Sequence, residues 1–511
     1  MFSFDDNQVF KRITTNIVIF VLIVVSVRES YLGLAQLLWF NAPDHYSYEI
    51  TGSFLNSGPY GGFLSVCGSV MFAYYVTFPH KHARFVLYRI WYRFCACAVF
   101  ITIFMLLSTH SRSAVLAFGC SILLLVVRIY GIIRIRGFLS HYGVVFFLSL
   151  FCLSICSYYY KKPSADGRLF MDKICLKAIY YNKGKGVGFG NFGGAYGGAQ
   201  AIYFETQIEK EGKNEIDWTA INEHDRITAD CPTYAFNDFL FVGVEAGVIK
   251  MLLLITLLLS GIVISYKRKT IWCYGLCAFG VFAFFYYPLH IFQFQILLPI
   301  LFILSIIEGD KTNGKKKYLE TAISLIMVFV ITIIIARKIP EEKNLKDAQN
   351  IWRKTEYWHN WGRYDYVVED CDSLFPYFKK NSHFLFVYGQ SLNKTGDYEK
   401  SDSILNIGTR ISSDPMFWNV MGNNSLAQGK YREAEERYKH AFYMVPNRLY
   451  PLVLLAKLYY TEGDTARFLE MTDVVENFVP KVESIRTENL RAEIRELKNN
   501  YLSEIEEKNE D

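Results

Sequence analysis

The chain has eleven cysteines but none of the spacing patterns that bind metals or carry redox chemistry. Eight of the eleven lie in or beside apolar stretches, where cysteine behaves as a small hydrophobic residue. Neither of the two close pairs, at 95/97 and 273/277, has the further ligands that zinc needs, so we expect no metal and no cofactor. Cys175 and Cys231 differ, because both lie in a polar segment where an oxidising compartment would permit a disulfide between them.

The chain also lacks the context that a signal peptide, a nucleotide site or a metal site requires. The first apolar run has no small-residue cleavage site, so we interpret it as a membrane anchor. Gly186-x-Gly-x-Gly has no strand-turn-helix context and does not indicate nucleotide binding. The segment 223–225 (Glu-His-Asp) offers too few converging ligands for a metal and is typical of a solvated charged surface.

Long apolar stretches dominate what is present. The chain has 511 residues, of which 52% are hydrophobic and 17% aromatic, and its mean hydropathy is +0.15, above ordinary soluble averages. A helix that spans a bilayer needs about 17 to 25 mainly apolar residues. We therefore predict an all-α fold whose polytopic membrane helical bundle has about nine spans, near 13–27, 60–79, 86–107, 113–131, 141–158, 238–265, 271–287, 291–307 and 319–337.

One long polar segment, residues 157–235, interrupts the apolar stretches. It contains no run long enough to cross a bilayer. Its start is basic, and a glycine-rich run follows from Gly186 to Gly198. This composition suits a large anionic ligand that is contacted by backbone and side-chain donors. We expect this outer loop to be where the protein works.

Lysine and arginine in the short loops predict the orientation, because cationic side chains are retained on the cytoplasmic side. The basic loops at 80–84, 128–136, 267–269 and 311–317 fall on one side if nine spans alternate from a cytoplasmic N-terminus. The outer side then receives the segment 41–59, the turn 109–112, the long loop and everything after Arg337.

The C-terminal third is charged and contains a repeat. Four glycines in similar contexts recur every 33 or 34 residues, and prolines stand near the unit ends. This period resembles tetratricopeptide repeats, in which each unit is a helical hairpin and the glycine permits the tight turn. The residues are Gly362, Gly396, Gly429 and Gly463, with Pro415, Pro446 and Pro480. Such repeats usually bind proteins or peptides, although many only brace an assembly.

These patterns divide the chain into three regions. We predict a membrane domain over 1–340 that carries the outer loop 157–235, and a soluble tetratricopeptide α-solenoid over 345–500. A polar helix begins near Thr487, and residues 501–511 are expected to form a frayed acidic tail.

Two arginines are candidates for a functional role. Arg112 lies at the outer end of the fourth predicted span, where a charged side chain is costly unless it has a partner and is commonly functional. The alternative is a side chain that reaches the lipid headgroups. Arg168 lies in the outer loop, where a solvated surface arginine is the alternative.

Four motifs in order resemble the O-antigen ligase superfamily of bacterial membrane glycan transferases. They are Thr51-Gly-Ser-Phe-Leu-Asn-Ser-Gly-Pro-Tyr-Gly-Gly-Phe-Leu64, Ser111-Arg-Ser-Ala-Val-Leu116, the run from Gly186 to Tyr196, and Ala235-Phe-Asn-Asp-Phe-Leu240 with Glu245-Ala-Gly247. The resemblance covers about residues 51–307 and implies a GT-C-like membrane fold. It also implies transfer of a glycan from a polyprenyl (undecaprenyl) pyrophosphate carrier to an acceptor hydroxyl or amine, on the periplasmic face of the inner membrane. Relatives with a tetratricopeptide tail occur.

The resemblance also implies site residues. Arg112 and Arg168 match the two arginine positions of the family and are expected to clamp the pyrophosphate, since a guanidinium binds phosphate through paired charged hydrogen bonds. The glycan is expected to meet the outer loop and its neighbourhood. The residues assigned to it are Gly186, Gly188, Gly190, Tyr196 and Asn237.

The expected general base is missing from its usual place. Ligases carry a histidine before the asparagine that is Asn237 here, but this chain has Phe236. Relatives also commonly have several spans before the Thr51 motif, where this chain shows one. Acidic and histidine side chains on the same side could accept the proton, and Glu245 is preferred. The candidates are Glu245, Asp238, His110, His224 and His290.

Three functions stay open. The first is a metal-independent glycan transferase, whose acceptor is lipid A core, as in lipopolysaccharide biosynthesis, or protein, as in protein O-glycosylation; the repeats would then dock a protein partner. The second is a non-catalytic envelope scaffold, which the missing histidine favours. The third is a transporter of the lipid-linked glycan, although the paired inverted repeats of transporters are not found. None of the three requires nucleic acid.

Overall fold

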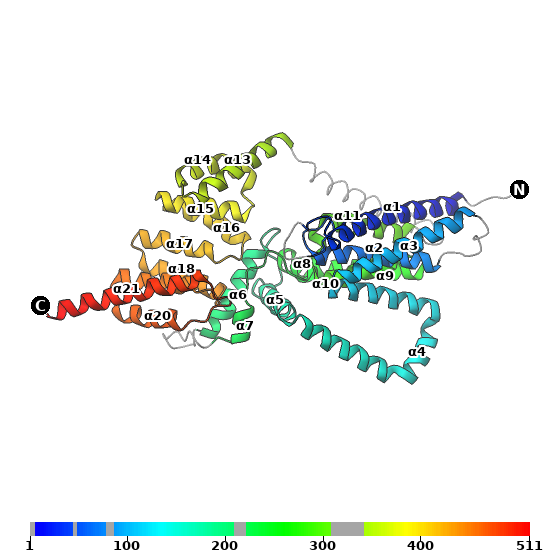
Figure 1. The fold of residues 1–511 in the computed structure, drawn as a ribbon, viewed down its shortest axis with the longest axis horizontal. Coiled ribbons are helices and arrows are strands. Elements are labelled where there is room, and N and C mark those ends of the chain that lie inside the picture. The colour runs from blue at the N-terminus through cyan, green and yellow to red at the C-terminus, as the bar shows by residue number, and fades with distance from the viewer. Residues whose placement is uncertain (1–5, 44–48, 78–85, 209–220, 308–341, 511) are drawn as a thin grey trace. The chain divides into compact units, whose positions relative to one another are not determined.

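The computed structural model describes residues 6–43, 49–77, 86–208, 221–307 and 342–510. Every regular element in these ranges is a helix, and they contain no strand (Figure 1). The prediction of an all-α chain with a helical membrane bundle and a helical C-terminal region is therefore confirmed. The chain divides into two compact units, each built from separate stretches of sequence.

The first unit comprises residues 1–162, 236–239 and 251–339. Its described helices follow the apolar stretches of the sequence. They are α1 (Asp6–Leu37), α2 (Ser57–Thr77), α3 (Val86–Ser108), α4 (Arg112–Tyr160), most of α9 (Val248–Lys267), α10 (Trp272–Phe285), the short 3-10 helix η2 (Pro288–His290) and α11 (Phe292–Ile307).

Four of the described helical segments are long and apolar enough to cross a membrane. They are 14–37, 86–108, 112–131 and 248–267, while α10 and α11 are shorter apolar helices. The fourth and fifth predicted spans both lie in α4, which bends at Gly131, where φ is +77°. The predicted span 319–337 and the basic loops 80–84 and 311–317 lie outside the described residues.

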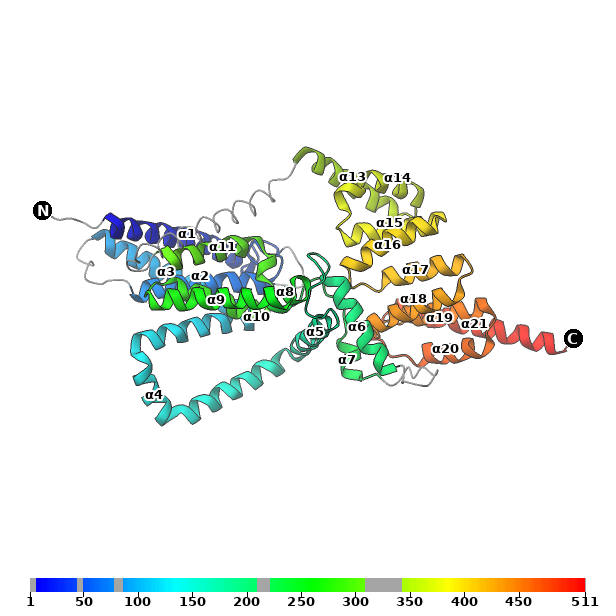
Figure 2. The ribbon, with the colours of Figure 1, turned by 180° about the vertical axis from the view of Figure 1, so that it is seen from behind.

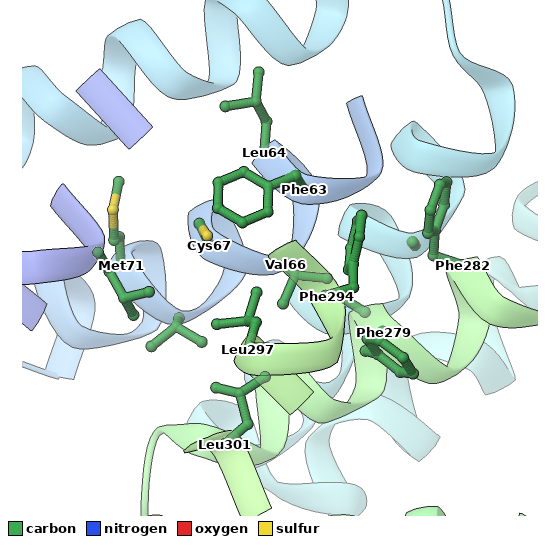
Figure 3. Close-up of a cluster of buried hydrophobic side chains, with 14 of the residues drawn as sticks. Phe63, Leu64, Val66, Cys67, Met71, Phe279, Phe282, Phe294, Leu297 and Leu301 are labelled. Carbon is green, nitrogen blue, oxygen red and sulfur yellow. The ribbon is translucent and has the colours of Figure 1, made fainter. Parts of the chain in front are cut away.

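Helix α2 lies at the centre of the first unit. Most of its residues are buried, and it packs against α1, α3, α4 and α10. Its apolar side chains meet those of α10 and α11 in one cluster that includes Phe63, Phe282 and Phe294 (Figure 3). Gly62 allows the close approach, because a Cβ there would lie 2.2 Å from the Phe282 ring. Small residues that let helices approach closely are typical of membrane helix interfaces.

The second unit comprises residues 163–235, 240–250 and 340–511. It joins the outer loop to the C-terminal helices. Its elements are α5 (Lys162–Tyr181), α6 (Phe192–Ile208), α7 (Glu223–Thr228), most of α8 (Asp238–Ala246), α13 (Glu342–Asn360), α14 (Tyr364–Phe378), α15 (Ser382–Thr395), α16 (Tyr398–Ile411), α17 (Met416–Ala427), α18 (Tyr431–Met444), α19 (Tyr450–Glu462), α20 (Thr465–Asn477) and α21 (Ile485–Glu510).

The four periodic glycines stand in the turns between consecutive C-terminal helices. Gly362, Gly396, Gly429 and Gly463 all have positive φ, between +69° and +89°. This left-handed conformation is costly for residues with a Cβ, and glycine adopts it at the ends of helices. The helices on either side of each glycine pack against each other, as in α15 with α16 and α17 with α18. Helix α21 packs on α19 and α20 and continues through residues 501–510, where the sequence predicted a frayed tail.

Candidate active site

Arg112 is the first residue of α4, and it joins the two ends of that bent helix. Its Nη1 donates a hydrogen bond to the Ser157 carbonyl oxygen at 2.5 Å, and its Nη2 donates to the Lys161 carbonyl oxygen at 3.4 Å. The guanidinium is half-buried. A guanidinium has five N–H donors, so two carbonyl contacts leave donor capacity for an anion. Arg112 therefore combines a fixed position with the chemistry of a phosphate ligand.

Arg168 lies on α5, in the second unit. The side chain is half-buried, and the helix that carries it begins at Lys162 in the basic part of the outer loop. Asp166, two residues before it, is buried. Each arginine is thus held within its own compact unit, and each is a separate candidate for phosphate binding.

The glycine-rich run forms a tight turn against the end of α8. Gly186, Gly188 and Gly190 have φ values of +83°, +94° and +83°. At Gly186 a Cβ would lie 2.6 Å from the carbonyl carbon of Ala246, so only glycine fits. The Gly188 N–H donates to the Glu245 carbonyl oxygen at 2.9 Å. The glycines are thus required by the conformation and packing of the turn itself.

Glu245 holds this turn through its side chain. The carboxylate oxygen Oε1 accepts hydrogen bonds from the Gly190 N–H at 2.8 Å and the Phe192 N–H at 3.2 Å, and the residue is buried. Phe192 begins α6. A carboxylate at a helix N-terminus satisfies unpaired N–H groups and is favoured by the helix dipole. The geometry gives Glu245 a bracing role, and its role as a base stays a prediction.

Tyr196 packs in the core of the second unit. It is 1% exposed, and its ring lies 5.7 Å from that of Phe192, which stacks on Phe241 at 4.6 Å. Burial raises the pKa of the Tyr196 phenol well above its ordinary value. Its position is that of a core residue on the inner face of α6.

Asp238 and His290 form a buried pair in the first unit. Asp238 is fully buried, and its Oδ1 lies 3.2 Å from Nδ1 of His290, while its Oδ2 accepts from the Leu289 N–H at 2.7 Å. The His290 side chain is 23% exposed. Asn237 caps α8, since its Oδ1 accepts from the Phe239 N–H at 3.1 Å. A carboxylate bound to one ring nitrogen orients a histidine and fixes its tautomer.

Phe236 stands two residues before Asp238, at the position where the resemblance predicts a histidine. Its ring meets Tyr286 at 5.2 Å and Tyr287 at 5.5 Å, both edge to face. Tyr287 directly precedes η2, the short helix that ends at His290. Residues 236–239 and the segment 286–290 therefore adjoin, and the His290 imidazole contacts Asp238, two residues after Phe236.

The outer loop contains a second histidine and carboxylate pair. Nε2 of His224 lies 3.2 Å from Oδ2 of Asp166, and the histidine side chain is 59% exposed. Beside it, Asp225 accepts a 2.8 Å hydrogen bond from Lys173 and another from the Tyr203 hydroxyl. Burial acts to raise the pKa of Asp225, but these hydrogen bonds outweigh it and the pKa is lowered. The cluster ties α5 to α6 and α7.

His110 stands in the turn between α3 and α4. It is exposed and has a positive φ of +51°, a conformation that is uncommon for residues other than glycine. Among the described residues, His110 forms no ion pair with a carboxylate. Of the three outer-side histidines that the sequence suggested, His224 and His290 are therefore the two with an acidic partner.

The disulfide that the sequence permitted between Cys175 and Cys231 is not formed, and all the cysteines in the described residues are free. Cys175 is buried on α5, and the Cys231 sulfur lies 3.0 Å from Nη2 of Arg448. Burial raises the pKa of both thiols. The possibility that the sequence left open is therefore not realised in the structure, where Cys175 is buried and Cys231 contacts Arg448. In the described residues, no group of three or more histidine, cysteine or acidic side chains could hold a metal ion.

Sequence reasoning did not single out Glu29, a buried acid on α1. Its carboxylate accepts from the Ser53 N–H and hydroxyl at 2.9 Å each and pairs with Arg28 at 2.5 Å. The Tyr60 hydroxyl donates to the Glu29 carbonyl oxygen at 3.0 Å. Glu29 thereby holds the motif that begins at Thr51. An acid within an apolar helix is the signal that would have found it.

The match to a protein family agrees with this arrangement. Residues 97–255 match the family model described as O-antigen ligase, and this range includes Arg112, Arg168 and the glycine turn with Glu245. No curated protein matches the chain. The family supports a membrane glycosyltransferase-type enzyme that moves a glycan between a lipid-linked donor and an acceptor. Residues 97–255 of the chain form a domain of the O-antigen ligase family.

Proposed function

We propose that this protein transfers a glycan from an undecaprenyl pyrophosphate carrier to an acceptor hydroxyl or amine at the periplasmic face of the bacterial inner membrane. The pair of Asp238 and His290 is the observation that carries the proposal. It supplies an oriented imidazole on Asp238, two residues after Phe236, which stands where the resemblance predicts a histidine. This pair gives the chain a candidate general base, whereas a non-catalytic scaffold would not need one.

The geometry of the pair favours His290 as the general base. A hydrogen bond from Nδ1–H to Asp238 places the lone pair of the neutral imidazole on Nε2. Nε2 would take the proton of the acceptor as its oxygen or nitrogen attacks the anomeric carbon. The bond between that carbon and the pyrophosphate oxygen then breaks, and the electron pair leaves with the polyprenyl pyrophosphate. Asp238 would stabilise the imidazolium, as a buried carboxylate does in hydrolase triads.

The leaving group gains negative charge on its phosphate oxygens, so arginine is the residue type that assists it. Arg112 is held by two backbone carbonyls and keeps donor capacity for an anion. Arg168 lies on α5 in the basic part of the outer loop. We propose that each of them binds the pyrophosphate, because charged hydrogen bonds in a water-poor site stabilise developing charge.

The remaining assignments complete the proposal. The C-terminal helices are proposed to be tetratricopeptide repeats, supported by glycines with positive φ in their turns. The outer loop and the repeats are proposed to be periplasmic, supported by the basic loops on the opposite side of the predicted spans. Lipid A core and protein are both kept as acceptors.

The test is to profile the glycans of lipopolysaccharide and glycoproteins in cells that lack the gene. These cells are complemented with the wild type or with one of four variants at equal membrane abundance: His290→Ala, Asp238→Asn, His224→Ala or Arg112→Ala. We expect His290→Ala to lose the product at least about 100-fold, the usual contribution of a general base. His224→Ala is the matched control and should retain transfer. Full transfer by His290→Ala would refute the assignment, and the glycoform that disappears would name the acceptor.

A further inference from the structure

Within the second unit, the outer loop is bound to the C-terminal helices. Helix α6 packs against α16 and α18 (Figure 2). The contacts involve two short stretches, residues 409–413 at the end of α16 and residues 444–448 at the end of α18. We call these two stretches the docking edge. They come from consecutive repeats, so the repeat geometry itself sets their spacing.

Glycines on α6 allow backbone to meet backbone at this edge. A Cβ on Gly194 would lie 2.4 Å from the carbonyl oxygens of both Thr409 and Arg410, and one on Gly193 would lie 2.5 Å from that of Ile411. The last carbonyls of a helix lack partners within it, so a close neighbour without side chains suits them. By contrast, a Cβ on Gly198 would meet nothing within 4 Å. The glycine content of α6 is thus explained in part by this contact.

Polar side chains hold the segment that follows α6 on the same edge. The buried Asn447 donates from Nδ2 to the carbonyl oxygens of Arg226 at 2.9 Å and Ala229 at 2.7 Å. Gln200 donates to the Met444 carbonyl oxygen. Further contacts on the edge join Ser413 to the Pro232 carbonyl oxygen at 3.1 Å and Arg448 to the Cys231 sulfur at 3.0 Å. Outside the edge, Lys481 pairs with Asp230 at 3.3 Å.

The docked helix in turn holds α5, which carries Arg168. Phe170 on α5 packs against Phe204 of α6 at 6.0 Å, and Lys173 donates to the Tyr203 hydroxyl at 2.7 Å. Phe170 lies two residues after Arg168 on the same helix. The position of Arg168 within the second unit therefore depends on α6, and the position of α6 depends on the docking edge.

We propose that the repeat region is a positioning platform for the outer loop, so that the docking edge contributes to donor binding through Arg168. The proposal rests on the proposed function, because it assigns Arg168 to the pyrophosphate. It differs from the expectation that the repeats serve to recruit a protein partner, since the docking edge is already covered by a segment of the same chain. Gly194 and Asn447 are then positioning residues.

The test compares the purified full-length chain as wild type, Gly194→Ala, Gly198→Ala, Arg168→Ala and the double variant Gly194→Ala/Arg168→Ala. Docking is followed by the rate at which a maleimide modifies Cys231, quantified by mass spectrometry of its peptide. Donor binding is followed with undecaprenyl pyrophosphate as the probe. Gly198→Ala is the matched control, because it adds the same methyl group to the same helix without a neighbour.

We expect Gly194→Ala to speed Cys231 modification several-fold and to weaken probe binding about tenfold, as the loss of one charged hydrogen bond would. Gly198→Ala should change neither quantity. The double variant should bind no more weakly than Arg168→Ala, because a residue that acts through another does not add to its loss. Asn447→Asp, which removes the amide donor, is the second variant if Gly194→Ala fails to fold.

The outcomes separate the two proposals. Faster Cys231 modification with unchanged probe binding, or losses that add in the double variant, would overturn the platform role. Unchanged modification in both Gly194→Ala and Asn447→Asp would overturn the docking itself. If the wild type does not bind undecaprenyl pyrophosphate, the proposed donor is wrong and the platform has no donor to position, while the modification rates still report whether the loop is docked.

Discussion

Replacing Gly186 by alanine perturbs the glycine turn in two ways that can be measured separately. The residue has a φ of +83°, and an added Cβ would lie 2.6 Å from the Ala246 carbonyl carbon and from the Gly247 nitrogen. Gly190 has the same φ of +83°, but a Cβ there would meet nothing within 4 Å. Gly190→Ala therefore reports the cost of the left-handed backbone alone, and Gly186→Ala reports that cost together with the clash.

The magnitudes follow from the two causes. A left-handed backbone costs an alanine about 1–2 kcal/mol, and forcing a methyl group into packed backbone costs about 1–3 kcal/mol more. For a unit of roughly 150–250 residues, each kcal/mol lowers the midpoint of thermal unfolding by about 2–4 °C. We expect Gly190→Ala to lower it by about 4 °C and Gly186→Ala by about 10 °C.

The assay is thermal unfolding of the purified chain in detergent, followed by circular dichroism and by proteolysis of the outer loop. Proteolysis assigns the transition to the second unit, which contains the turn. Equal shifts for the two variants would refute the reasoning, because the close backbone approach at Gly186 would then cost nothing. A larger shift for Gly190→Ala would refute it as well.

Two further predictions concern charged groups of the second unit. Glu245→Gln should keep glycan transfer within a few-fold, since an amide oxygen can still accept the hydrogen bonds from the two N–H groups. Glu245→Ala leaves both N–H groups unpaired and should cost about 1–3 kcal/mol of unfolding free energy. Loss of transfer in a folded Glu245→Gln would show that Glu245 is the base. Because the pKa of Asp225 is lower in the folded state, its pairing with Lys173 stabilises the fold above about pH 4 and is lost as the pH falls further. Asp225→Asn should therefore be about 1 kcal/mol less stable than wild type at pH 7. The difference between the two unfolding midpoints should shrink as the pH falls below about 4, and a constant difference would contradict this.

Much of the fold could be predicted because it depends on local patterns. Apolar runs specify the helices of the first unit, and a period of 33 or 34 residues places glycine at each turn of the C-terminal helices, where a positive φ is needed. The bend in α4 was predicted only as two separate spans, since the sequence shows an interruption without its geometry. The acidic tail 501–511 is predicted to fray, and in the structure α21 extends to Glu510.

The site was predicted only in part, because it depends on contacts between distant residues. Asp238 and His290 were both named as candidates, but their separation of 52 positions hid their pairing. Glu245 was preferred as a base from its place in a motif, yet the structure shows it bracing a turn 55 positions earlier. The sequence permits a disulfide between Cys175 and Cys231 if the compartment is oxidising, but it does not give the distance between them, and both are free in the structure.

The sequence by itself determined that this is a helical membrane protein with one long polar segment between its apolar stretches, a periodic C-terminal region and the motifs of a glycan transferase. Hydropathy, glycine spacing and motif order are properties of short segments, so they can be recognised without a fold. Only the tertiary structure decided that His290 pairs with Asp238, two residues after Phe236, and that the docking edge holds α6. Both depend on packing that brings segments far apart in the chain within a few ångströms, and no local pattern encodes that distance.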